Sequence, residues 1–174
     1  MFEVVKLPTK TLRERSVEVD PKEITTPEFQ AYLDELIATM FAEDGVGIAS
    51  PQVGRNIRAI VVNYGKHGPE CYMNPEILKA SEAMVGSEEG CLSVYSEDGK
   101  TKIWGNVERH RKISVKALNR LGREVTLELR DFPSIVMQHE IDHLNGVLFI
   151  DYLSALKRNM ILRKVEKLKK QEIL

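Results

Sequence analysis

The chain has 174 residues, and its 25 Lys and Arg against 26 Asp and Glu give a net charge of −1. This balance argues against DNA or an anionic membrane as a partner, and the length suits a single domain, residues 1–174, with its own core. No apolar run reaches membrane-spanning length, and residues 1–10 lack the apolar core of a signal peptide, so we expect a cytoplasmic protein. In a reducing compartment, Cys71 and Cys91 are expected to be free or metal-bound.

The first part of the chain predicts an extended arm followed by an amphipathic helix. Pro8, Pro21 and mixed charges favour an extended arm over residues 1–24, anchored by Val4, Val5 and Leu7. Thr26 suits the N-cap of a helix and Pro27 its first turn. The apolar residues that follow have the spacing of one helical face: Phe29, Tyr32, Leu33, Leu36, Ile37, Met40 and Phe41.

The middle of the chain predicts strands and turns. Residues 45–54 are glycine-rich but lack the Lys-Ser/Thr ending of a phosphate loop, so their small residues indicate close backbone approach instead. Strands are expected at 58–63, at 71–73, and in an antiparallel hairpin of 113–117 with 125–129. Residues 94–107, which include the single Trp104, predict an excursion or hairpin of unassigned purpose.

The last third predicts two helices. Asp131 or Phe132 is expected to cap the first, with Pro133 in its first turn and Gly146 at its end. A short apolar strand or extension is expected at 147–150. Ser154 opens a basic helix, residues 154–174, with Leu156, Met160, Val165 and Leu168 on one side.

The first of these helices carries a His-Glu-x-x-His pattern. His139 and His143 are four residues apart, so they share one helical face, and Glu140 lies beside the first. Apolar residues flank this face and the opposite one, which predicts a buried helix. Because buried histidines need a partner, the pattern indicates a metal site.

The third metal ligand stays open on the residues alone. No histidine follows His143, and Glu166, the first later glutamate, lies on the basic helix. Cys91 is the alternative, since a Cys/His/His set suits zinc, ferrous iron and other divalent metals. A lone cysteine is equally compatible with a small buried apolar residue.

Three stretches together resemble the signature motifs of peptide deformylases. They are Gly-Val-Gly-Ile-Ala-Ser-Pro-Gln (45–52), Glu-Gly-Cys-Leu-Ser (89–93) and Gln-His-Glu-Ile-Asp-His (138–143). Their order and separation also fit, and the resemblance covers essentially the whole chain. It implies an α+β fold with antiparallel β-sheets around a central metal-binding helix, plus one helix in the N-terminal half and one at the C-terminus.

The resemblance also implies a function, which is the hydrolytic removal of the formyl group from N-formylmethionyl nascent peptides. Cys91, His139 and His143 match the metal ligands, and Glu140 matches the general acid/base. Gln52 and the backbone N–H of Leu92 match the oxyanion donors. One divalent ion is expected, Fe²⁺ in the native enzyme, with Zn²⁺, Ni²⁺ or Co²⁺ able to substitute.

From the resemblance and the facing of the motif helix, the substrate site is expected in and around these three motifs. Residues 45–48 would pair with the substrate backbone as an added strand. The substrate-binding residues expected are Gly45, Val46, Gly47, Ile48, Glu89, Gly90, Arg109, Phe132, Ile135 and Val136. Asp142 is expected to face away from the metal and to orient a histidine or cap local backbone. The basic C-terminal helix is expected to dock on the ribosome.

Some positions depart from the family pattern. Tyr95 stands where a proline is usual, extra residues precede Arg109, and Asp131-Phe132-Pro133 replaces a glycine-rich entry to the motif helix. Ile48 and Ser50 replace the usual Leu and Ala, and both changes are small. The alternatives are another metalloamidase or a zinc endopeptidase, with a third ligand other than Cys91, and a metal-binding relative without turnover.

Overall fold

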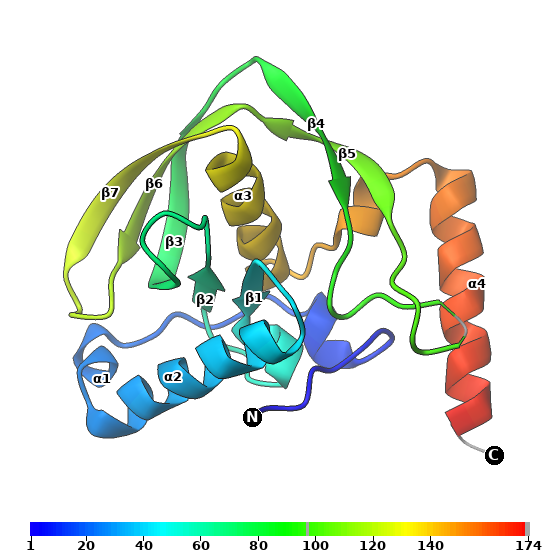
Figure 1. Ribbon diagram of the computed structural model, residues 1–174, viewed down its shortest axis with the longest axis horizontal. Coiled ribbons are helices and arrows are strands. Elements are labelled where there is room, and N and C mark those ends of the chain that lie inside the picture. Colours follow the sequence, from blue (N-terminus) through cyan, green and yellow to red (C-terminus); the bar gives the residue numbers. More distant parts are fainter. Residues whose placement is uncertain (97, 173–174) are drawn as a thin grey trace.

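The computed structural model, which describes residues 1–96 and 98–172, contains two antiparallel sheets and a helix that contacts both (Figure 1). The larger sheet has the strand order β1-β2-β3-β6-β7, and β4 and β5 form the smaller one. The strands are β1 (Gly47–Ala49), β2 (Ala59–Val62), β3 (Glu70–Ala80), β4 (Met84–Glu89), β5 (Gly105–His110), β6 (Lys112–Leu118) and β7 (Glu124–Arg130). The predicted α+β class with antiparallel sheets is confirmed.

The described residues also form four α-helices and three 3₁₀ turns. They are η1 (Lys10–Arg13), α1 (Pro21–Ile24), α2 (Pro27–Ala42), η2 (Ser50–Val53), α3 (Phe132–Leu144), η3 (Phe149–Tyr152) and α4 (Ala155–Glu172). Helix α3 contacts β1, β2 and β7 of the larger sheet and β5 of the smaller one. This position brings the His-Glu-x-x-His pattern to the space between the sheets (Figure 1).

Helix α2 follows the predicted pattern closely. The Thr26 hydroxyl accepts a hydrogen bond from the amide of Phe29 at 3.3 Å, and Pro27 is the first helical residue. Most of the predicted apolar face is buried against β1 and β2. Phe41 is the exception, because its side chain is 51% exposed at the end of the helix.

Strand β3 is longer than predicted, because it continues past Asn74-Pro75 to Ala80. The register with β6 shifts between Met73 and Glu76, and Asn74 has a φ of 52°. The Asn74 side chain bonds both the N–H and the carbonyl of Val19 at 2.8 and 2.9 Å. This irregularity accommodates Pro75, which lacks a backbone donor.

The hairpin of β6 and β7 is confirmed, whereas β4 was not predicted and β5 was only partly included in the excursion. Strand β4 pairs with β5 from Met84 opposite His110 to Glu89 opposite Gly105. Neither strand has a continuous apolar face, so the sequence lacks the alternation of apolar and polar residues that would predict a strand there.

The ends of the two C-terminal helices differ in detail from the predictions. Asp131 takes the N-cap position of α3, but its side chain makes no capping hydrogen bond. The strand alternative at 147–150 is wrong: Leu148 is extended, but Asp151 accepts a hydrogen bond from its amide at 3.0 Å, and the turn η3 begins at Phe149.

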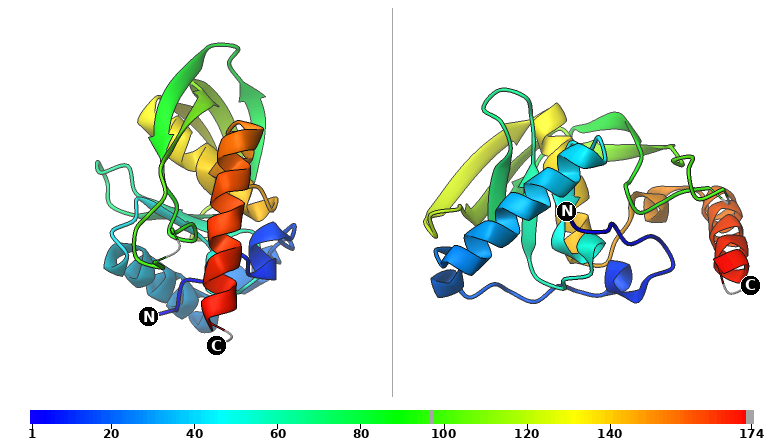
Figure 2. Two further views of the ribbon diagram at one scale, coloured as in Figure 1. Left: turned by 90° about the vertical axis from the view of Figure 1, so that its right-hand side faces the viewer. Right: turned by 60° about the horizontal axis from the view of Figure 1, so that its bottom comes forward.

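Helix α4 lies at the far end of the molecule from β7 (Figure 2). Ile161 and Val165 are buried, but Leu156 and Met160, which were predicted to share the packed side, are 73% and 51% exposed. The side chain of Leu168 and residues 173–174 lie outside the described part of the chain.

The N-terminal arm is extended as predicted except for η1 and α1. Val4 and Leu7 are buried, and the amides of Val5 and Leu7 donate to the carbonyls of Gln52 and Ser93. The arm therefore ties two of the motif segments together. None of the helices in the described ranges has both the length and the apolarity needed to cross a bilayer.

Candidate active site

Cys91, His139 and His143 come together as a potential metal-binding group. One ligand atom from each residue lies within 4.8 Å of the others, and Sγ of Cys91 is 3.3 Å from Nε2 of His143. The histidines project from successive turns of α3, while Cys91 follows β4. A thiolate and two imidazoles in a buried site form a donor set that suits zinc or ferrous iron, and they leave a position open for a further ligand.

The side chain of Glu89 positions one of these histidines. Its Oε1 accepts a hydrogen bond from Nδ1 of His139 at 2.8 Å, so Nε2 of His139 remains for a metal. Arg109 donates to both carboxylate oxygens of Glu89, at 2.9 and 2.8 Å. Arg109 also donates to Asp142 at 2.6 Å, and Tyr152 donates to the same Asp142 oxygen at 2.9 Å.

These contacts change three of the predicted placements. Asp142 does face away from the metal-binding atoms, but it bonds Arg109 and Tyr152 and not a histidine. Glu89 is the carboxylate that orients a histidine. Arg109 is 3% exposed and bonded to Glu89 and Asp142, so its guanidinium is engaged within the protein and is not directed at the cavity.

Burial and the neighbouring charges shift the pKa values of the side chains in this site, and the direction differs from one side chain to the next. Burial alone would raise the pKa of Glu89, but Arg109 and His139 lower it to about 2. Burial lowers the pKa of His143 well below its usual value. Burial also disfavours the charged form of His139, yet hydrogen bonds to Cys91 and Glu89 raise its pKa to about 10. Without a metal, His139 holds a proton that metal binding must displace.

Glu140 lies beside the same group with half of its carboxylate unpaired. Oε1 is 4.0 Å from Nε2 of His139, and Oε2 is buried without a hydrogen-bond partner in the described structure. Burial raises the pKa of Glu140 to about 7. A Cβ at Gly47 would lie 2.7 Å from Oε1, so only glycine fits opposite this carboxylate. An unpaired buried carboxylate next to three metal-binding atoms fits a site that holds a metal and a water molecule.

Gln52 is held next to the thiol. Its Oε1 accepts from the amide of Ala49 at 2.9 Å, and its Nε2 lies 3.5 Å from Sγ of Cys91 and 3.2 Å from Oγ of Ser93. Leu92, the residue after the thiol, is buried and lines the same cavity. Both predicted oxyanion donors are therefore adjacent to Cys91.

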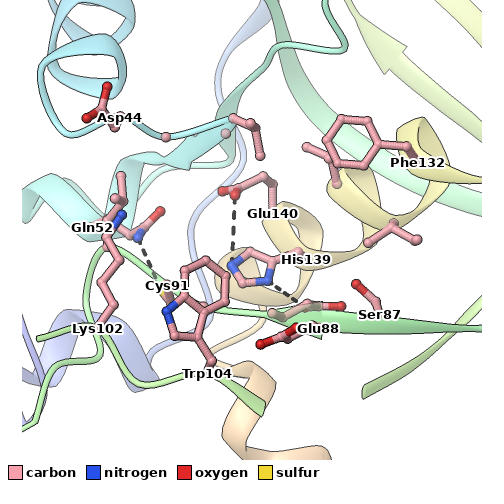
Figure 3. A pocket seen from close by; sticks show the side chains of 18 residues that line it. Asp44, Gln52, Ser87, Glu88, Cys91, Lys102, Trp104, Phe132, His139 and Glu140 are labelled. Carbon is pink, nitrogen blue, oxygen red and sulfur yellow. Dashed lines mark hydrogen bonds and ion pairs between the residues drawn. The ribbon is translucent and has the colours of Figure 1, made fainter. Parts of the chain in front are cut away.

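A cavity of about 260 Å³ opens onto this group (Figure 3). Eight of the ten predicted substrate-binding residues line it: Gly45, Val46, Gly47, Glu89, Gly90, Phe132, Ile135 and Val136. Arg109 does not line it, and neither does Ile48, whose side chain is fully buried in the core. Strand β1 stands at the edge of the larger sheet, so one side of its backbone is open to another strand.

Several residues of the cavity were not predicted from the sequence. They are Asp44, Ser87, Glu88, Lys102 and Trp104. A single tryptophan in a polar, turn-rich stretch is the one signal that could have pointed to the 94–107 segment, because large aromatic residues are enriched where molecules bind.

Comparison with known proteins gives a consistent result. The family model for polypeptide deformylase matches residues 1–159. The peptide deformylase of Caulobacter vibrioides is 40% identical over 151 residues, covering 84% of each chain. Peptide deformylase 1 of Vibrio vulnificus is 40% identical over 171 residues, 96% of this chain and 95% of that one.

Solved structures agree. The crystal structure of a peptide deformylase from Legionella pneumophila matches with a TM-score of 0.85 at 34% identity, over 99% of this chain and 98% of that one. The Ehrlichia chaffeensis peptide deformylase in complex with actinonin matches with a TM-score of 0.84 at 34% identity, over 98% and 97% of the two chains.

Proposed function

The chain belongs to the polypeptide deformylase family and is thus a hydrolase of N-formyl peptides, and we propose that its substrates are new polypeptides that begin with N-formylmethionine. The observation that carries this proposal is the Cys91, His139 and His143 group beside Glu140, at the end of a cavity with apolar walls. The reaction adds water across the formyl amide, giving formate and a free N-terminal amine.

Cys91, His139 and His143 would hold one divalent metal ion, and α3 is then the metal-binding helix of the fold. When bound, such an ion acidifies a water molecule and polarises a carbonyl oxygen. The three residues fit such an ion because one ligand atom of each lies within 4.8 Å of the others. We propose Fe²⁺ as the native ion, with Zn²⁺, Ni²⁺ or Co²⁺ able to replace it.

Glu140 is the proposed general acid/base. Its unpaired Oε2 takes a proton from the attacking water and then gives it to the amine as the C–N bond breaks. A pKa near 7 suits both halves of this transfer at neutral pH. The Gln52 side chain and the N–H of Leu92 would donate to the oxygen that gains charge, and one such donor is typically worth about 3 kcal/mol.

The cavity walls account for the proposed methionine. Val46, Phe132 and Val136 offer apolar surface to an unbranched side chain. The open edge of β1 could pair with the backbone of the substrate and align the formyl group with Glu140. Since Gly47 has no side chain, the substrate backbone can approach that carboxylate closely.

The zinc endopeptidase alternative is less consistent with the site. It needs a third ligand other than Cys91, and Glu166, the only glutamate after the motif until 172, is exposed on α4 and does not belong to the potential metal-binding group. A metal-binding relative without turnover would have no use for an unpaired Glu140. The family and the intact set of side chains favour catalysis.

We also propose that the enzyme works in the cytoplasm next to the ribosome, where formylated chains emerge. The exposed basic residues Arg163 and Lys170 on α4 would contact RNA phosphates.

The test of the activity is formate release from formyl-Met-Ala-Ser by the metal-loaded protein. Glu140→Gln should retain the metal and lose at least about 99% of kcat, consistent with a general acid/base contributing 10²–10⁴-fold. Glu108→Gln, an exposed glutamate on β5, is the matched control and should retain activity. Actinonin, which is bound in the Ehrlichia relative, should inhibit release. More than a few per cent activity in Glu140→Gln would contradict the assignment.

A further inference from the structure

The only tryptophan of the chain, Trp104, stands at the rim of the active-site cavity. A Cβ at Gly90 would lie 3.0 Å from the indole ring, so the ring packs directly on the backbone that precedes Cys91. The side chain is nevertheless 58% exposed. Trp104 therefore presents a large apolar surface to solvent while it packs on Gly90, the residue that precedes the metal-binding Cys91.

A second cavity of about 260 Å³ adjoins the other side of Trp104. Trp104 and Glu88 line both cavities, so the two hollows are neighbours that share one wall. The second cavity lies between the start of β5 and α4, and Leu153, Met160 and Ile161 give it apolar surface.

Lys157 and Lys164 of α4 outnumber the one carboxylate that lines the second cavity, that of Glu88, so the cavity has a net positive charge. Lys157 and Lys164 are seven residues apart, so they lie on one helical face two turns from each other. Neither ammonium group has an ion-pair partner among the side chains that the structure describes. Met160, 51% exposed, lies between them on the helix. Unpaired cations around an apolar floor are complementary to an acidic side chain with its hydrocarbon stem.

We propose that the second cavity binds the substrate polypeptide a few residues after the formylmethionine, with Trp104 as the platform between the two cavities. Lys157 and Lys164 then favour acidic side chains at those positions. The substrate necessarily extends beyond the first cavity, and an extended chain advances about 3.3 Å per residue, so three or four residues suffice to cross an aromatic side chain. This proposal rests on the proposed deformylase function and assigns a role to the 94–107 segment.

The experiment compares three substrates with the metal-loaded protein: formyl-Met-Ala-Ser and two formyl hexapeptides that continue with Asp-Glu-Asp or with Lys-Lys-Lys. The wild-type protein should prefer the acidic hexapeptide in kcat/KM by about three- to tenfold, as expected for two exposed charge pairs. The preference should fall as salt is raised.

Lys157→Gln/Lys164→Gln should reduce this ratio to near one. Arg163→Gln/Lys170→Gln removes the same charge from the same helix outside the cavity and should retain the wild-type ratio. Trp104→Ala should lower kcat/KM for the hexapeptides more than for the tripeptide, while Trp104→Phe, which keeps a ring, should restore part of the difference.

Trp104 also supplies a binding measurement that does not depend on turnover. Its fluorescence should respond to the deformylated products, with the acidic hexapeptide binding more tightly than the lysine one. Formate release from the tripeptide with equal rates on both hexapeptides would overturn the second site and leave the deformylase function standing. Absence of formate release from all three peptides would overturn the function itself.

Discussion

The carboxylate of Glu89 accepts a hydrogen bond from Nδ1 of His139 at 2.8 Å, and the guanidinium of Arg109 bonds both oxygens of that carboxylate. Glu89 and Arg109 are 6% and 3% exposed, so the pair is a buried support for a metal-binding imidazole. It fixes which ring nitrogen faces the metal site, because a carboxylate can only accept the proton on Nδ1.

Glu89→Gln should therefore weaken metal binding without removing a ligand. The dissociation constant is expected to rise about 10–100-fold, the usual effect of losing a partner that orients a ligand. Competition with a chromophoric chelator measures it. Glu88→Gln changes the neighbouring, exposed glutamate and should leave the constant unchanged. Equal affinity in Glu89→Gln and the wild type would contradict the orienting role.

Glu89 should also make the metal-free protein sensitive to acid. Its pKa is lowered from 4.5 to about 2, so its contribution to the free energy of unfolding is complete above pH 4.5 and lost as the pH falls through 2. The shift corresponds to roughly 3 kcal/mol. Urea unfolding with a chelator present should show wild type and Glu89→Gln converging between pH 5 and pH 2. A constant difference over that range would contradict the linkage.

Cys91→Ser should lower the metal content of the purified protein, because a hydroxyl is a much weaker ligand than a thiolate for borderline metals. Elemental analysis by mass spectrometry measures the content. Cys71→Ala is the control, since Cys71 is buried in the core cluster under α2 and has no part in the metal-binding group. Full metal occupancy in Cys91→Ser would show that the third ligand is another residue.

If iron is the native metal, activity should decay in air. Oxygen can reach an open site that contains both ferrous iron and a thiolate, and oxidation damages either. Protein purified anaerobically should retain activity, and replacement by Ni²⁺ should protect it. The comparison is specific activity against hours of air exposure, with metal content measured in parallel. Equal decay curves for the two metals would exclude iron oxidation as the cause.

Ribosome docking through α4 is best tested by charge reversal. Deleting residues 163–174 would remove Val165, which is buried in the same cluster as Cys91, and would disturb the site itself. Arg163→Glu/Lys170→Glu should reduce co-sedimentation with ribosomes at low salt. The control, Lys66→Glu/Lys79→Glu, changes two exposed lysines outside α4 and should leave co-sedimentation unchanged. Unchanged co-sedimentation, or none with the wild type, would exclude docking by this surface.

Elements with regular apolar spacing were predictable from the sequence. Most of the apolar face of α2 and that of β6 are buried as their periodicity indicates, and the apolar face of β7 is partly buried. The pairing of β4 with β5 was not predictable for a physical reason. The buried positions of these strands include Glu89 and Arg109, which stabilise each other as an ion pair, so no alternation of apolar residues marks the strands.

The site was predictable only in part for a related reason. The spacing of His139 and His143 on one helix is a local property, so the sequence shows it. Cys91 lies 52 residues before His143, and Glu89 lies 50 before His139, so their approach depends on the packing of separate elements. The residues alone left Cys91 as one alternative for the third ligand, and the family resemblance selected it. The resemblance placed Glu89 in the wall of the substrate site and did not indicate that Glu89 orients a metal ligand.

A metal ion held by Cys91 and His143 would also act as a cross-link. It would close a loop of 52 residues and fasten the end of β4 to α3. Because the unfolded chain does not hold these ligands together, the metal would leave on unfolding, and its binding free energy would add to the free energy of unfolding. The supply of metal would then determine how much of the protein resists proteolysis, in addition to how much of it is active.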